Sequence, residues 1–87
     1  MDDIRNPIEE DAVTESAVLQ HLLSLHPTQI TVAELIREIA ADPQSFSQRD
    51  SIERAVRDLA GAGLVHRNAE FVLPSRAALR FNELLER

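Results

Sequence analysis

The three histidines are the side chains of this sequence best suited to bind a metal ion or to transfer protons. His21 and His26 are five residues apart, which places them off a common helical face, whereas a four-residue spacing lets two histidines share a metal. His66 stands alone in a strand-like segment. A metal site would need ligands brought together across the fold or across a dimer. We therefore predict no metal and no cofactor, and interpret the histidines as solvated or partly buried.

The remaining residue types do not form a catalytic pattern. The chain has no cysteine, which excludes thiolate catalysis, disulfides and cysteine-ligated zinc and indicates a reducing compartment. Gly61-Ala62-Gly63 lacks the longer glycine pattern and the following helix of a phosphate-binding loop. No nucleophile elbow or paired-carboxylate motif is present, and 87 residues leave little room for a shielded pocket. We predict that the chain is not an enzyme and has no catalytic residues.

All positive charge comes from arginine, in a chain whose net charge is −6. Residues 1–44 hold nine acidic residues and two arginines, whereas residues 45–87 hold six acidic residues and seven arginines. In one predicted helix, arginines and acidic residues are four positions apart in the pairs Asp50–Arg54, Glu53–Arg57 and Arg54–Asp58. This spacing predicts ion pairs that neutralise the arginines.

The apolar spacing predicts a flexible acidic arm at residues 1–13 followed by one domain at residues 14–87. Thr14 is a suitable N-cap for a first helix that ends at His26-Pro27. Thr31 and Glu34 predict a capping box for a second helix that ends near residue 41, after an extended piece at 29–31. The residues of the second helix that we expect to face inward are Val32, Leu35, Ile36 and Ile39.

A third helix is predicted from a buried stripe of Ile52, Ala55, Val56 and Leu59. Ser47 with Asp50, or Asp50 with Glu53, can cap this helix. We expect Phe46, in the preceding turn, to be an anchor in the core. Gly63 is expected to end the helix in a left-handed conformation, with Leu64 folding back as its apolar partner.

Two β-prone runs at residues 64–67 and 71–73 predict a hairpin in which Asn68 takes a positive φ. Ser75 then caps a last helix. Leu79 lies outside the apolar stripe of that helix, either as scattered exposure or as part of a dimer contact. The residues that we expect to share the buried face are Ala77, Ala78, Phe81, Leu84 and Leu85.

The segment from Asp50 to Val65 resembles the recognition helix leading into the wing of winged helix-turn-helix proteins such as MarR-, PadR- and ArsR-like bacterial regulators. In those families the helix has the pattern "apolar, x, x, small, apolar, x, x, Leu" and is followed by "Gly, Leu, apolar". This sequence matches both patterns, with Ile52, Ala55, Val56 and Leu59 in the helix and Gly63, Leu64 and Val65 after it. The resemblance covers residues 14–85. It implies a mainly α fold with a small β-hairpin, built as a three-helix core, a short wing and a C-terminal helix.

The resemblance also implies a transcription regulator that binds DNA. The third helix would enter the major groove, the hairpin would touch the backbone or minor groove, and a homodimer would place its two third helices about one DNA turn apart. The residues implied as DNA contacts are Gln48, Arg49, Arg54, Arg57, Arg67 and Arg76.

Two other functions fit the same sequence. A winged helix can be a protein–protein interaction module without DNA binding, which predicts an exposed apolar patch and an acidic first half that faces a basic partner. A small acidic chain can also imitate nucleic acid, as an accessory protein of a mobile element. The N-terminus does not resemble a secretory signal, and no apolar run approaches the roughly 20 residues of a membrane span. We therefore expect a cytoplasmic protein without membrane partners.

Overall fold

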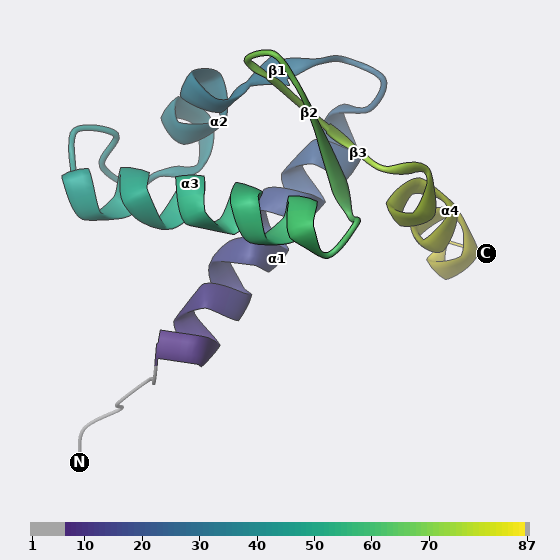
Figure 1. Ribbon diagram of the computed structural model, residues 1–87, viewed down its shortest axis with the longest axis horizontal. Helices are drawn as coiled ribbons and strands as arrows, with labels where there is room; N and C mark the ends of the chain where they lie inside the picture. The colour runs from purple at the N-terminus through teal and green to yellow at the C-terminus, as the bar shows by residue number, and fades with distance from the viewer. Residues whose placement is uncertain (1–6, 87) are drawn as a thin grey trace.

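Four helices and three short strands make up residues 7–86, the part of the chain that the computed structural model describes (Figure 1). The strands form an antiparallel sheet of order β1-β3-β2, so the structure has the expected mainly helical character with a small sheet. The elements are α1 (Pro7–Leu25), β1 (Ile30–Thr31), α2 (Val32–Ile39), α3 (Phe46–Gly61), β2 (Val65–Asn68), β3 (Phe71–Pro74) and α4 (Arg76–Leu85).

The first helix begins earlier than the sequence pattern indicated. α1 starts at Pro7, so the prediction of a flexible arm up to residue 13 is wrong for residues 7–13, and residues 1–6 lie outside the described part. Thr14 is not an N-cap, because it lies inside the helix and its hydroxyl donates to the carbonyl oxygen of Glu10 at 3.0 Å. Proline is favoured in the first turn of a helix, and acidic residues there interact favourably with the helix dipole. The acidic segment therefore extends α1.

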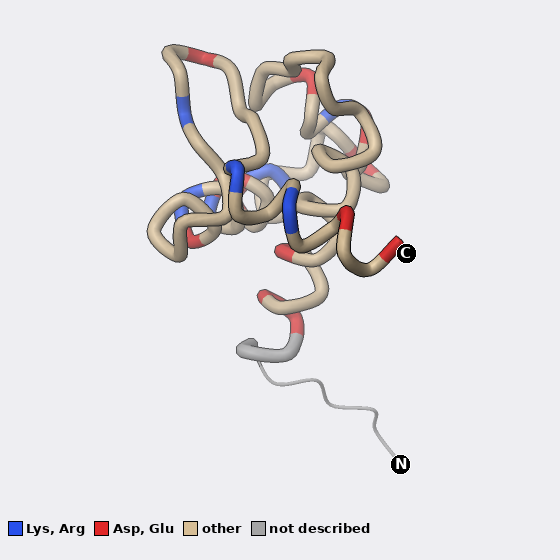
Figure 2. The backbone as a smooth tube through the Cα atoms, turned by 90° about the vertical axis from the view of Figure 1, so that its right-hand side faces the viewer, with Lys and Arg blue, Asp and Glu red and all other residues tan. Residues whose placement is uncertain are grey.

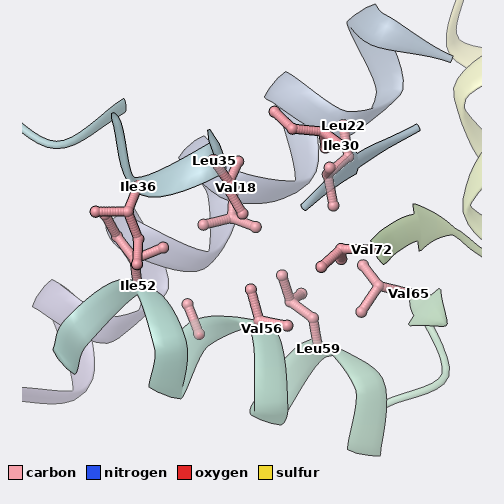
Figure 3. Close-up of a cluster of buried hydrophobic side chains, with 11 residues drawn as sticks. Val18, Leu22, Ile30, Leu35, Ile36, Ile52, Val56, Leu59, Val65 and Val72 are labelled. Atoms are coloured by element: carbon pink, nitrogen blue, oxygen red, sulfur yellow. The ribbon is translucent and has the colours of Figure 1, made fainter. Parts of the chain in front are cut away.

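One hydrophobic core lies where α1, α2, α3 and the sheet meet (Figure 3). The predicted stripe of α3 is buried, and α2 turns Leu35 and Ile36 fully inward, with Val32 and Ile39 partly buried at the edge. Both inward faces are thus confirmed. The core residues are Val18, Leu22, Ile30, Leu35, Ile36, Ile52, Ala55, Val56, Leu59, Val65 and Val72.

The boundaries of α2 and α3 are set by local hydrogen bonds. The capping box of α2 is confirmed: Glu34 N donates to the hydroxyl of Thr31 at 3.1 Å, and Thr31 N donates to the Glu34 carboxylate at 2.9 Å. The N-cap of α3 is Ser45, which accepts from Gln48 N at 3.3 Å, and neither predicted alternative is correct. α3 therefore begins at Phe46.

Phe46 is not a core anchor, and that prediction is wrong. Its side chain is 80% exposed. Because α3 already includes Phe46, the helical period places this residue on the side of Asp50, Glu53 and Arg57, all of which face solvent. The core is filled from the opposite side of α3.

The end of α3 follows the prediction closely. Gly63 has a φ of 83°, its N–H donates to the carbonyl of Ala60 at 3.1 Å, and Leu64 N donates to the carbonyl of Leu59 at 2.9 Å. This pair of bonds is a Schellman motif. Leu64 packs against the core, as expected. The chain then enters the sheet.

The predicted hairpin is present, with a third strand added to it. β2 pairs with β3 from Val65 opposite Pro74 to Asn68 opposite Phe71, and β1 pairs with the other edge of β3. The residue with positive φ is Ala69, at 56°, and not Asn68. Asn68 instead forms the last pair of the ladder, which moves the tight turn one residue further along the chain.

The last helix buries fewer residues against the domain than the sequence pattern predicted. Ser75 caps α4 as predicted, accepting from Ala78 N at 3.1 Å. Ala78 is buried and Leu79, expected outside the stripe, is half-buried. The rest of the predicted buried face is wrong, because its residues are exposed: Ala77, Phe81, Leu84 and Leu85. α4 lies at one end of the molecule, where it packs on α1 by its opposite side (Figure 1).

Candidate nucleic-acid interface

Arg54 is occupied by two carboxylates. Its guanidinium donates to Asp50 Oδ2 at 2.9 Å and to Asp11 Oδ1 at 3.2 Å. The first contact is one of the three predicted pairs along α3; the second connects α3 to the early turns of α1. No ion pair is formed between Glu53 and Arg57 or between Arg54 and Asp58. Arg54 is therefore the least available of the predicted DNA contacts.

Gln48 is also engaged in hydrogen bonds within the fold. Its side-chain oxygen accepts from Asp42 N at 2.9 Å, and its own backbone N–H is bonded to the cap residue Ser45. The side chain is half-buried against the turn between α2 and α3. Its role in this structure is to hold that turn, so it is not presented as a base-reading amide.

Arg49 lies in an open hollow of about 620 Å³ between α2 and α3. Arg37 of α2 lines the same hollow and was not among the predicted site residues. Val32, Ile36 and Glu53 also line it. Two guanidinium groups from different helices are thus brought to one concave surface.

A second hollow adjoins the first, because both include Val32 and Ala33. It contains Arg67 of β2 and Glu70 of the hairpin loop. We call the two hollows together the arginine groove; its charged residues are Arg37, Arg49, Glu53, Arg67 and Glu70. The groove runs from the N-terminal half of α3, across the start of α2, to the hairpin.

The arginines of this groove have no ionic partner in the described structure. Among the side chains of residues 10–86, none of Arg37, Arg49 and Arg67 is within ion-pair distance of a carboxylate. All three are exposed. They are therefore available to bind an anionic ligand, in contrast to Arg54.

The other two predicted contacts lie apart from the groove. Arg57 is exposed on the solvent side of α3, and Arg76 is exposed at the start of α4. Neither lines either hollow. Of the six predicted residues, the structure therefore brings together only Arg49 and Arg67. Arg37 could have been suspected from its position on the outward side of α2, but only the fold shows that it lies beside Arg49.

The early turns of α1 carry only negative charge among the described residues, at Glu10, Asp11 and Glu15. In the rest of the described fold, arginines and carboxylates are interspersed on α2, α3, the hairpin and α4 (Figure 2). The negative end of α1 projects away from the body of the fold (Figures 1 and 2).

His21 has a contact that its sequence position did not indicate. Its Nε2 lies 2.6 Å from Glu38 Oε1, which links α1 to α2 near the surface. Among the described residues, no cluster of histidine and acidic side chains has the arrangement of a metal site. Within the same part of the chain, no helix is both long enough and apolar enough to cross a bilayer.

Comparisons with known proteins do not assign this site. No protein family, no curated protein and no solved structure matched the chain. The geometry of the arginine groove is therefore the basis for a functional proposal.

Proposed function

We propose that this chain is a winged-helix protein that binds DNA through the arginine groove and regulates transcription. Three features support the fold assignment: α2 and α3 are joined by a short turn, α3 ends directly before a hairpin, and α1 packs across both helices. In this arrangement α3 is the recognition helix and β2 with β3 is the wing.

The observation that carries the proposal is that Arg37, Arg49 and Arg67 line two adjoining hollows and that, among the described residues, none of them is within ion-pair distance of a carboxylate. Arg37 lies on α2, Arg49 on the recognition helix α3 and Arg67 on the wing strand β2. A DNA backbone that follows the groove would therefore contact all three elements. Guanidinium groups bind phosphate oxygens by charge-assisted hydrogen bonds, often in pairs. Phosphate contacts of this kind fix the position of a protein on a duplex.

The charge of the chain determines how strong this binding is. Two glutamates lie in the groove, and the net charge of −6 opposes the approach of DNA at long range. If three phosphates are contacted, the logarithm of the binding constant falls with the logarithm of the salt concentration with a slope of about −3. We therefore expect modest affinity that is detected most readily at low salt.

The test is binding of the purified chain to mixed genomic DNA fragments at about 20 mM and about 150 mM salt. Arg49→Ala and Arg67→Ala are expected to weaken binding by about ten-fold each and to lower the salt slope by about 1. Arg54→Ala is the matched control, because it removes the same charge from α3 outside the groove. Enrichment of discrete sequences would identify the operator. Absence of binding at low salt, or an equal loss in all three variants, would overturn the proposal.

A second candidate function is docking of a protein partner on the other side of α3. A hollow of about 260 Å³ lies between α1 and α3 and is lined in part by Val13, Ala17 and Ile52. On α1, the acidic residues Glu10 and Asp11 precede Val13 in the chain. An apolar surface beside carboxylates suits a basic amphipathic segment. Ala17→Arg would fill this hollow. If the chain fails to bind DNA, capture of a basic partner that is lost in Ala17→Arg supports this alternative.

A further inference from the structure

Two exposed side chains on the solvent side of α3 have no use in binding phosphate. Phe46, the first residue of the helix, is 80% exposed. Glu53, seven residues later, is also exposed and lies on the same side of α3. An apolar ring offers phosphate no hydrogen bond, and a carboxylate repels it. The arginines of the groove therefore do not account for either residue.

The carboxylate of Glu53 lies among arginines that do not neutralise it. Arg49 is one helical turn before it and Arg57 one turn after it, and Arg37 of α2 lines the same hollow as Glu53. Among the side chains of residues 10–86, none of these arginines is within ion-pair distance of Glu53. The Glu53 oxygens are therefore free to accept a hydrogen bond from a ligand that the arginines hold in place.

Phe46 is the most exposed of the large apolar side chains in the described part of the chain. The core does not use it, because α3 packs by its opposite side. Burying such a ring against a ligand lowers the free energy in proportion to the apolar area removed from water. Pro43 and Gln44, in the turn before α3, line the same hollow as Arg49. Phe46 thus follows directly on the part of the turn that borders the arginine groove.

The major groove of DNA offers a partner for each of these two side chains. Cytosine is the base whose major-groove edge presents a hydrogen-bond donor, the N4 amino group, and no acceptor. A glutamate oxygen accepts from this amino group, whereas the acceptor atoms of the other bases repel it. Thymine presents its C5 methyl group, which a phenylalanine ring can contact. In a helix that enters the groove, the N-terminal residues are the ones that reach the base edges.

We propose that α3 reads pyrimidines: Glu53 accepts a hydrogen bond from a cytosine amino group, and Phe46 packs on a thymine methyl group. This inference rests on the proposed DNA binding, in which α3 enters the major groove. The two residues are about 10 Å apart along the helix, roughly the rise of three base pairs. The arginines fix the position of the duplex. The cost of placing a carboxylate near phosphates is offset where cytosine supplies the donor, which makes the contact selective.

Selection of bound duplexes from a random-sequence DNA library at about 50 mM salt tests the contact of Glu53. We expect the parent chain to prefer cytosine at one position by at least about five-fold. Glu53→Gln should change this preference to adenine, which glutamine binds by two hydrogen bonds. Asp58→Asn should keep the parent's preference; it is the matched control, because Asp58 is an exposed carboxylate of α3 that lines neither hollow of the groove. A preference in Glu53→Gln identical to the parent's overturns this contact.

Uracil in place of thymine tests the contact of Phe46, because the two bases differ only by the methyl group. At one thymine of the selected site, this exchange should weaken binding of the parent by about four-fold, the effect of one buried methyl group. Phe46→Ala should bind the two duplexes equally. Leu85→Ala, at an exposed apolar residue of α4, should keep the difference. If no uracil exchange changes the parent's affinity, or if Phe46→Ala remains sensitive, this contact is overturned.

Base readout by α3 and phosphate binding by the arginine groove are distinguished by the same set of proteins. Circular dichroism confirms that each variant is folded. Binding that depends on Arg49 and Arg67, with base preferences that neither Glu53→Gln nor Phe46→Ala changes, overturns the readout and leaves the proposed function standing. A parent chain that binds no duplex at low salt overturns both.

Discussion

Arg54 of α3 donates a hydrogen bond to Asp11 of α1 at 3.2 Å, across two helices whose contacting residues are 43 positions apart in the chain. This contact joins the early turns of α1 to α3. It also explains why α3 has fewer arginines free of ion pairs than its sequence contains. Asp11 is thus part of the surface that α1 shares with α3.

The Asp11–Arg54 pair is expected to contribute little to stability. Both side chains are 40% exposed, so solvent screens their attraction. A double-mutant cycle with Asp11→Asn and Arg54→Gln, measured by urea unfolding, should give a coupling of about 0.2–1 kcal/mol that decreases at high salt. A coupling of several kcal/mol, or one that does not respond to salt, would contradict this account of the pair.

The capping box of α2 should make stability depend on pH through Glu34. The backbone N–H of Thr31, then its hydroxyl, hydrogen-bond the Glu34 carboxylate, and these bonds with nearby Arg37 hold the pKa of Glu34 below its usual value, against a smaller opposing effect of desolvation. The folded state therefore favours the ionised form. Its contribution is present above the ordinary glutamate pKa and is lost as pH falls through the lowered pKa of the folded state.

Glu34→Gln isolates this effect, because glutamine can also close a capping box but does not titrate. We expect the free energy of unfolding of the parent to fall relative to that of Glu34→Gln as pH is lowered from 7 into the acid range. Urea unfolding at a series of pH values measures the difference. A constant difference between the two proteins at all pH values would show that Glu34 is not the titrating group.

The parts of the fold that follow from local patterns could be predicted from the sequence. The buried stripe of α3, the Thr31–Glu34 capping box and the left-handed Gly63 each depend on residues within one or two helical turns of one another. Phe46 could not be placed in this way. Phe46 is exposed because Ser45 is the N-cap of α3, which makes Phe46 the first residue of the helix. Ser45, Ser47 and Asp50 are all suitable N-caps, and the spacing of the residues does not show which of them is used.

α4 and the arginine groove show what local patterns omit. The amphipathic spacing of Phe81 and Leu84 correctly indicates an apolar side, but spacing alone does not show whether that side faces its own domain or another chain. The groove is assembled from three separate segments. Arg49 and Arg67 were predicted from the sequence as contact residues, whereas nothing in the sequence pattern indicates that Arg37 lies beside them. The sequence pattern also does not indicate the ion pair between Asp11 and Arg54.

The hairpin loop should be stabilised by glycine at position 69. Ala69 has a φ of 56°, where a β-carbon crowds the following carbonyl and raises the energy by about 1–2 kcal/mol. Ala69→Gly removes this crowding but adds freedom to the unfolded chain, so we expect a net gain of about 0.5–1 kcal/mol. Ala12→Gly, in the exposed interior of α1, should instead lower stability by about 1 kcal/mol. Thermal or urea unfolding measures both; a loss of stability in Ala69→Gly would contradict the assigned turn.

The two glycines at the end of α3 should respond in opposite directions to the same substitution. Apart from the adjacent residues and the backbone of α3 itself, a β-carbon at either position meets no atom within 4 Å, so tertiary packing does not distinguish the two glycines. Gly61 is the last helical residue, where alanine is favoured by up to about 1 kcal/mol, whereas Gly63 has a φ of 83° that disfavours alanine by about 1–2 kcal/mol. Gly61→Ala is thus expected to raise the free energy of unfolding and Gly63→Ala to lower it. If urea unfolding shows equal effects for the two variants, the Schellman motif does not end α3 as described.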